Sequence, residues 1–174
     1  MRRIIGKAIT SCLHQEIQNA AGPLQVSAGL KSGPEAAIHA MKEIFQTEGT
    51  DAVILVDAAN AFNSMNRAVA LHNIQYLCQE FATVLINTYR KPSRIFLMNG
   101  GEIQSAEGTT QGDPLAMSFY GISITPVVTY LRTTVPDVSQ VWLADDATGA
   151  GSLKALYKWW KLLMEEGKRY GYYV

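Results

Sequence analysis

Two short apolar segments that each end in aspartate constrain the fold of this sequence more than any other feature. Residues 52–56 stop at Asp57, and residues 138–143 are followed one residue later by Asp145 and Asp146. Short apolar runs are typical of buried strands, whose ends project side chains at the edge of a sheet. Carboxylates that converge there suit a hard cation such as Mg²⁺. The alternative is that each aspartate forms a turn or caps a helix, although adjacent like charges repel unless a cation lies between them.

The composition is that of a chain that folds around an apolar core. Of its 174 residues, 48% are apolar and 17% are charged. No segment approaches the about 18 consecutive apolar residues of a membrane span, so we expect neither disorder nor a membrane partner. Fifteen basic and fifteen acidic residues give a net charge of zero, so any nucleic-acid contact must come from local basic groups. Cys12 and Cys78 fit reduced thiols of an intracellular protein, with nucleus and cytoplasm not distinguished.

Turn residues and apolar periodicity divide the chain into helices and short strands without a linker, which predicts a single domain. We expect one helix over residues 2–20 and another from Pro34 to about Gly49, each with an apolar stripe in the core. The stripes contain Ile4, Ile5, Ala8, Ile9 and Leu13 in the first helix and Ile38, Met41, Ile44 and Phe45 in the second. Asn66 should cap a further helix.

The middle of the chain predicts a hairpin followed by a helix. Residues 94–99 and 102–106 are separated by Gly100 and Gly101, and a turn there needs the positive φ values that these residues adopt. Asp113 and Pro114 should begin a helix that Pro126 kinks or ends.

The end of the chain predicts an amphipathic helix capped by Ser152. Gly149–Gly151 lack a dinucleotide-binding context, and we interpret them as the turn before this helix. Trp159 lies off the predicted apolar stripe, so we expect a C-terminal segment beyond this sequence to cover it, with a contact surface as the alternative.

Three motifs carry the sequence's specific chemistry. Residues 56–63, Val-Asp-Ala-Ala-Asn-Ala-Phe-Asn, place an aromatic ring five residues after an aspartate. Residues 110–115, Thr-Gln-Gly-Asp-Pro-Leu, place backbone amides at a helix start. Residues 143–146 are Leu-Ala-Asp-Asp. Together and in this order, the motifs resemble those of a reverse transcriptase, an RNA-directed DNA polymerase, and are most similar to the retrotransposon and retroelement branch.

The resemblance implies an α+β fold. It implies a polymerase palm over about residues 51–174, in which helices back a small antiparallel sheet, preceded by partial fingers over about residues 1–50 and without a thumb. The chain would be a fragment of a longer polymerase, so we expect it on its own to bind primer–template weakly and to extend it poorly or not at all.

The resemblance also implies a metal site. Asp57 and Asp145 would hold two Mg²⁺ ions, for which Mn²⁺ can substitute. The backbone carbonyl of Ala58 would complete one metal shell, and Asp146 would support the ligands.

The implied partners are an RNA or DNA template with its primer and deoxynucleoside triphosphates. Gln111 and Gly112 would lie against the incoming nucleotide. Phe62 would lie under its sugar, where a ring collides with a 2′-hydroxyl and so favours deoxynucleotides. The basic residues expected to contact nucleic acid are Arg90, Lys91 and Arg94.

Two other functions stay open at this point, and the sequence indicates no oligomeric state. One is an inactive retroelement-derived fragment that acts as a nucleic-acid-binding or scaffold module, which the zero net charge favours. The other is an unrelated Mg²⁺-dependent phosphotransferase, which predicts a parallel sheet.

Overall fold

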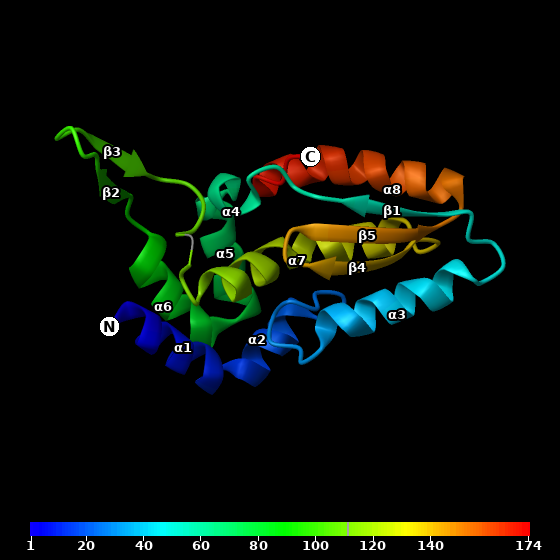
Figure 1. The fold of residues 1–174 in the computed structure, drawn as a ribbon, viewed down its shortest axis with the longest axis horizontal. Helices are drawn as coiled ribbons and strands as arrows, with labels where there is room; N and C mark the ends of the chain where they lie inside the picture. Colours follow the sequence, from blue (N-terminus) through cyan, green and yellow to red (C-terminus); the bar gives the residue numbers. More distant parts are fainter. Residues whose placement is uncertain (111) are drawn as a thin grey trace.

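The computed structural model describes residues 1–110 and 112–174 and centres on an antiparallel sheet (Figure 1). This sheet has the strand order β1-β5-β4, with β1 at Ala52–Val56, β4 at Ser139–Leu143 and β5 at Asp146–Gly151. A separate two-stranded sheet pairs β2 (Ser93–Phe96) with β3 (Glu102–Ser105) and stands away from the first (Figure 1). The helices are α1 (Arg2–Cys12), α2 (His14–Ala21), α3 (Gly33–Phe45), α4 (Ala61–Ser64), α5 (Arg67–Leu77), α6 (Gln79–Tyr89), α7 (Ala116–Thr134), α8 (Leu153–Glu166) and the 3₁₀ helix η1 (Gly167–Tyr170).

Helices back one face of the three-stranded sheet. Trp142 of β4 packs on Trp159 of α8 with ring centroids 6.3 Å apart. Gly149 of β5 faces α8, and a Cβ there would be in van der Waals contact with Leu156 at 3.5 Å. Helix α7 contacts both β4 and α8. The expected α+β fold, a small antiparallel sheet backed by helices, is therefore confirmed, and the sheet lacks the parallel direction that an unrelated phosphotransferase predicts.

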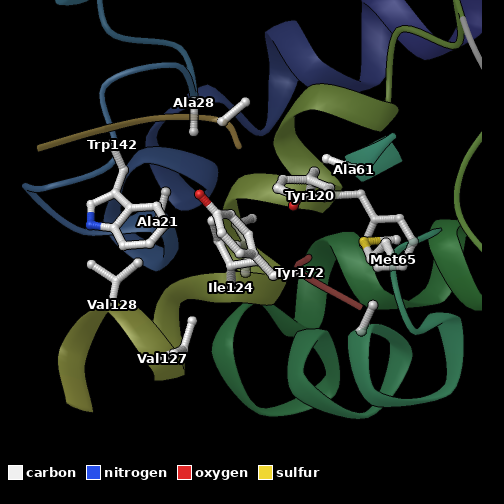
Figure 2. Close-up of a cluster of buried hydrophobic side chains, with 14 of the residues drawn as sticks. Ala21, Ala28, Ala61, Met65, Tyr120, Ile124, Val127, Val128, Trp142 and Tyr172 are labelled. Atoms are coloured by element: carbon white, nitrogen blue, oxygen red, sulfur yellow. The ribbon is translucent and has the colours of Figure 1, made fainter. Parts of the chain in front are cut away.

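Large aromatic side chains fill the core behind the sheet (Figure 2). Trp142 and Tyr172 have ring centroids 5.8 Å apart, and both are almost fully buried. Tyr120 of α7 belongs to the same cluster of buried side chains. Gly171 ends η1 in a left-handed conformation, and the next residue, Tyr172, is buried. The C-terminal segment therefore turns back into the core.

The predicted caps at Asn66 and Ser152 and the predicted hairpin are confirmed. The Asn66 side chain accepts a hydrogen bond from the Val69 backbone, and the Ser152 side chain accepts one from Ala155. The hairpin forms where expected, although its strands are shorter than predicted. Over the described residues, no helix is long and apolar enough to cross a membrane.

The prediction for the N-terminal helices is wrong in two respects. The first helix breaks at Leu13 into α1 and α2, and Ile4 and Ile5 are exposed rather than in the core. The exposure of Ile4 follows from the close approach of α1 at Gly6, where a Cβ would lie 3.2 Å from Pro114. Because Gly6 faces inward, Ile4 turns to the opposite side of the helix.

The apolar stripe of α3 also lies outside the closed core. Ile38 is 68% exposed and Phe45 is 52% exposed. Ile38 and Met41 instead border a groove over the open face of the sheet, whose floor includes Val53 and Leu55. The periodicity correctly predicted a helix, but the sheet face opposite it stays open.

The structure differs from the predictions at three points in the second half of the chain. Gly149–Gly151 form part of β5 rather than a turn, because strands β1 and β4 pair with β5 on both sides. Helix α7 begins at Ala116, later than the predicted start at Asp113 and Pro114, and Pro126 does not end it, because the helix continues to Thr134. Trp159 is fully buried, because α8 packs its indole against Trp142 beneath the sheet.

Candidate active site

The fold brings the strand-end aspartates to one end of the central sheet. Val56 is paired with Ala147, so Asp57 leaves β1 beside Asp146, the first residue of β5. Asp145 lies one residue earlier, in the turn between β4 and β5. Three carboxylates from two separate motifs therefore lie at neighbouring strand ends, and their chemical roles stay predictions.

The electrostatics of this carboxylate group favour a bound cation. Burial raises the pKa of Asp145, and the neighbouring charges of Asp146 and Asp57 raise it as well. Burial and Asp57 likewise raise the pKa of Asp146. Among the described residues, none of the ion pairs involves these three side chains.

The donor set fits a metal that a substrate helps to bind. Within residues 1–110 and 112–174, no three His, Cys, Asp or Glu side chains gather closely enough to hold a metal by themselves. Mg²⁺ usually takes only one or two protein carboxylates, and water and substrate phosphates complete its octahedral shell. The three carboxylates have no cationic partner in the described part of the chain and are hard oxygen ligands. They therefore fit Mg²⁺ that is bound partly by substrate and water, rather than a metal enclosed by protein ligands alone.

A groove of about 590 Å³ leads to the carboxylates. Its floor is the open face of the sheet, its wall is α3, and Asp57 and Asp146 line it. Leu55 on this floor is 80% exposed. The acidic end of the sheet is therefore accessible to a large ligand.

The loop after Asp57 is tied to the C-terminal segment. Ala58 is buried, and the Ala59 amide donates a 2.6 Å hydrogen bond to the Tyr173 carbonyl. Phe62, in α4, is half-buried and packs on Tyr120, with ring centroids 4.9 Å apart and the rings tilted by 33°. Tyr120 comes from α7, so a second element supports the Phe62 ring.

The loop that carries the second motif docks on α4. The Thr109 amide donates a 2.6 Å hydrogen bond to the Phe62 carbonyl, and the Gly108 amide donates one of 2.9 Å to Met65. Gly108 has a φ of 65°, and a Cβ there would lie 2.4 Å from the Phe62 carbonyl oxygen, so only glycine fits. Gly112 follows on the same loop, while the predicted nucleotide contact Gln111 lies outside the described residues.

Arg67 holds the start of this loop. Its guanidinium donates hydrogen bonds to the backbone carbonyls of Ser105, Glu107 and Gly108, at 2.8, 2.5 and 2.9 Å. The side chain is buried beside Tyr89, 5.6 Å from the centre of that ring. The buried Arg67 guanidinium thus fixes the path of the loop, because carbonyl oxygens of the loop accept its hydrogen bonds.

A buried carboxylate fixes the other end of the loop. Asp113 accepts hydrogen bonds from Arg2 at 2.6 Å, from the Tyr89 hydroxyl at 2.5 Å and from the Leu115 amide at 3.2 Å. Burial alone would raise the pKa of Asp113, but the hydrogen bonds from Tyr89 and Arg2 outweigh it and lower that pKa. Burial and Asp113 in turn raise the pKa of Tyr89 to about 12.

We expect Asp113→Asn to destabilise the protein at neutral pH by about 2 kcal/mol, because hydrogen bonds to an ionised group are lost. Since the folded-state pKa is lowered, the ionised carboxylate stabilises the fold above its unfolded pKa of about 4, and this stabilisation is lost as the pH falls through the folded pKa. Urea unfolding should therefore show a gap between wild type and variant at pH 7 that closes in acid. Exposed Asp137 supplies the control Asp137→Asn, and an equal gap at every pH would contradict this origin.

The predicted nucleic-acid contacts lie apart from the carboxylates. Arg90 and Lys91 follow α6, and Arg94 lies in β2 of the separate two-stranded sheet. All three are exposed, and Arg94 makes one ion pair, with Glu102 at 3.8 Å. The structure places them together at the base of the hairpin.

Sequence reasoning missed the residues that hold the turn containing Asp145. Gln25 bonds to Ala144, and the Tyr172 hydroxyl donates a 2.7 Å hydrogen bond to the Asp145 carbonyl. Gln25 and Ala144 are 119 positions apart. No local pattern signals a contact over such a separation.

Comparisons with known proteins support the fold through structure rather than sequence. No protein-family model matches the chain, and no curated protein matches it. The apo telomerase of Candida tropicalis truncated from its C-terminal domain matches with a TM-score of 0.68 and 16% identity, over 96% of this chain and 38% of that one. The telomerase of Candida albicans, in complex with a TWJ fragment of telomeric RNA, matches with a TM-score of 0.70 and 11% identity, over 99% and 33%.

These matches are to catalytic subunits of telomerase, a reverse transcriptase, and they show a similar fold. The chain therefore has a palm-like α+β fold. It spans only 38% and 33% of these two relatives.

Proposed function

We propose that this chain is the core of a reverse transcriptase, which transfers a deoxynucleotide to the 3′-hydroxyl of a primer on an RNA or DNA template. One observation carries the proposal. Asp57 and the pair Asp145–Asp146 meet at neighbouring strand ends of a telomerase-like fold, and the loop that leads into the second motif docks on α4, which follows Asp57 in the chain. Neither a catalytic histidine nor a nucleophilic cysteine is needed, because positioning and charge neutralisation suffice for in-line phosphoryl transfer.

In this proposal Asp57 and Asp145 bind two Mg²⁺ ions, the Ala58 carbonyl completes one shell and Asp146 supports both ligands. Mn²⁺ can replace Mg²⁺ at such oxygen ligands. Bound metal supplies charge neutralisation for the triphosphate and acidity for the primer hydroxyl. Burial, together with repulsion from Asp146 and Asp57, raises the pKa of Asp145, and a bound cation would relieve that repulsion.

The remaining residues bind the nucleotide and the nucleic acid. Gln111 and Gly112 contact the deoxynucleoside triphosphate, and Phe62 lies under its sugar. Arg90, Lys91 and Arg94 contact phosphates of the template or primer, where lysine and arginine supply affinity without sequence specificity. An RNA partner is supported by the telomerase of Candida albicans, whose structure contains telomeric RNA.

Primer extension with the protein in molar excess over primer–template, at low salt, tests the proposal. These conditions compensate for weak binding, because affinity for phosphates rises as salt falls. We expect slow, Mg²⁺-dependent addition of deoxynucleotides that chelation abolishes.

Phe62→Ala should increase the use of ribonucleotides relative to deoxynucleotides by about tenfold or more, because the ring no longer excludes the 2′-hydroxyl. Competition between matched nucleotides in the extension assay measures this ratio. The control Phe45→Ala removes a 52% exposed ring at the end of α3. Equal ratios in wild type and Phe62→Ala would show that Phe62 has another role.

The alternative of an inactive nucleic-acid-binding or scaffold module is favoured by the zero net charge. It predicts binding to primer–template without any nucleotide addition. The extension assay, run beside a binding titration, separates the two functions.

A further inference from the structure

The turn that carries Asp145 has an unusual backbone conformation. Ala144 has a φ of 56°, in the left-handed region that residues with a Cβ rarely adopt. The turn is also only two residues long, between Leu143 and Asp146. A conformation of this kind persists only where surrounding contacts determine it.

A single buried side chain supplies most of those contacts. Gln25 is 4% exposed. Its Oε1 accepts a 2.7 Å hydrogen bond from the Ala144 amide, and its Nε2 donates a 3.1 Å bond to the Ala144 carbonyl. The Ser27 hydroxyl accepts a second bond from that amide at 3.0 Å and donates to Gln25 Oε1 at 2.8 Å. Both polar backbone groups of Ala144 are thus held from one segment.

Gln25 is itself fixed in place. The Val26 amide donates to the Trp142 carbonyl and the Trp142 amide donates to the Leu24 carbonyl, both at 2.8 Å, so this segment runs beside β4. Helix α7 leaves space for the Gln25 side chain at Gly121, where a Cβ would lie 3.0 Å from Gln25 Cγ. The site is shaped for a side chain of this size.

The two peptide groups on either side of Asp145 are held independently. Gln25 binds the carbonyl of the peptide before Asp145, and Tyr172 binds the carbonyl of the peptide after it, at 2.7 Å. These two peptide planes set the direction in which the Asp145 side chain leaves the backbone.

We propose that Gln25 is a positioning residue that directs the Asp145 carboxylate toward the metal site. The inference rests on the proposed function, because it takes Asp145 as a metal ligand. Groups that orient a metal ligand through hydrogen bonds typically change metal affinity by about 10–100-fold when they are removed.

The chain contains a matched control for this residue. Gln140 is also a buried glutamine, at 6% exposure. Its Oε1 accepts hydrogen bonds from the indoles of Trp142 and Trp159, each 3.0 Å long, and its Nε2 donates to the Val128 carbonyl. These contacts stabilise the core behind the sheet and do not involve the turn.

The test is a titration of the full chain with Mn²⁺, followed by electron paramagnetic resonance. We expect Gln25→Met to weaken Mn²⁺ binding by about tenfold or more, and Gln140→Met to lower thermal stability without changing Mn²⁺ affinity. Should Gln25→Met not fold, Ser27→Ala removes one bond to Ala144 and should weaken binding less, in the same direction.

The outcomes separate this inference from the proposed function. If Asp57→Asn abolishes Mn²⁺ binding but the Gln25 or Ser27 variant binds Mn²⁺ as tightly as the wild type, the positioning role alone is overturned. Wild-type binding that Asp57→Asn leaves unchanged would remove the proposed metal site and the inference with it.

Discussion

Asp145→Asn is expected to reduce primer extension at least about a hundredfold, because even residues that only support a metal ligand change metal affinity by up to about that factor. Asparagine keeps the size of the side chain and leaves the backbone carbonyl that Tyr172 binds. It removes one of three charges that repel one another. The variant should therefore fold at least as stably as the wild type while losing activity.

Paired measurements check this prediction: single-turnover extension rates, and thermal unfolding of the same samples. Asp137→Asn serves as the control, since Asp137 is exposed and belongs to none of the three motifs. An Asp145→Asn protein that retains extension within a few fold of wild type would exclude Asp145 as a metal ligand. A large loss of stability would instead assign this residue to the fold.

Trp159→Ala is expected to cost about 3–5 kcal/mol of unfolding free energy, the usual loss for a buried aromatic residue replaced by alanine. The indole is fully buried, packs on Trp142 and donates a hydrogen bond to Gln140. Truncation leaves a cavity behind the sheet and removes one of the two indole donors to Gln140.

The neighbouring Trp160 gives a direct comparison. It is only half-buried on the same helix, so Trp160→Ala should cost clearly less. Chemical unfolding followed by circular dichroism measures both variants. Equal losses would mean that α8 presents a different face to the sheet.

The sequence predicted the features that depend on short segments. The run before Asp57 and the run before Asp145 are strands with aspartates at their ends, as their apolar patterns indicated. The caps at Asn66 and Ser152 follow from side chains that bond within three residues.

The features that the sequence did not predict depend on tertiary packing. Gly149 is typical of a turn, yet it belongs to β5 because it pairs with Ile54 of β1 and Gln140 of β4. Trp159 is buried although it lies off the predicted stripe, because its partner, Trp142, approaches from another element. Periodicity within one helix does not reveal which side a distant strand will cover.

The residues of the candidate site likewise include some that the sequence predicted and some that it did not. The aspartates Asp57, Asp145 and Asp146 were identified from their motifs, and pairing of β1 with β5 brings them together. Gln25 and Tyr172 were not identified as site residues, because they reach the turn from distant parts of the chain and lie outside the three motifs.

Templated addition of a deoxynucleotide from an RNA strand tests the central claim most directly. A primer annealed to RNA is incubated with excess protein, Mg²⁺ and each deoxynucleoside triphosphate in turn, and the product is resolved at single-nucleotide length. The proposed function predicts extension only with the nucleotide complementary to the template, and none with Asp145→Asn. Protein that is folded and bound to primer–template but adds no nucleotide with Mg²⁺ or Mn²⁺ would contradict it.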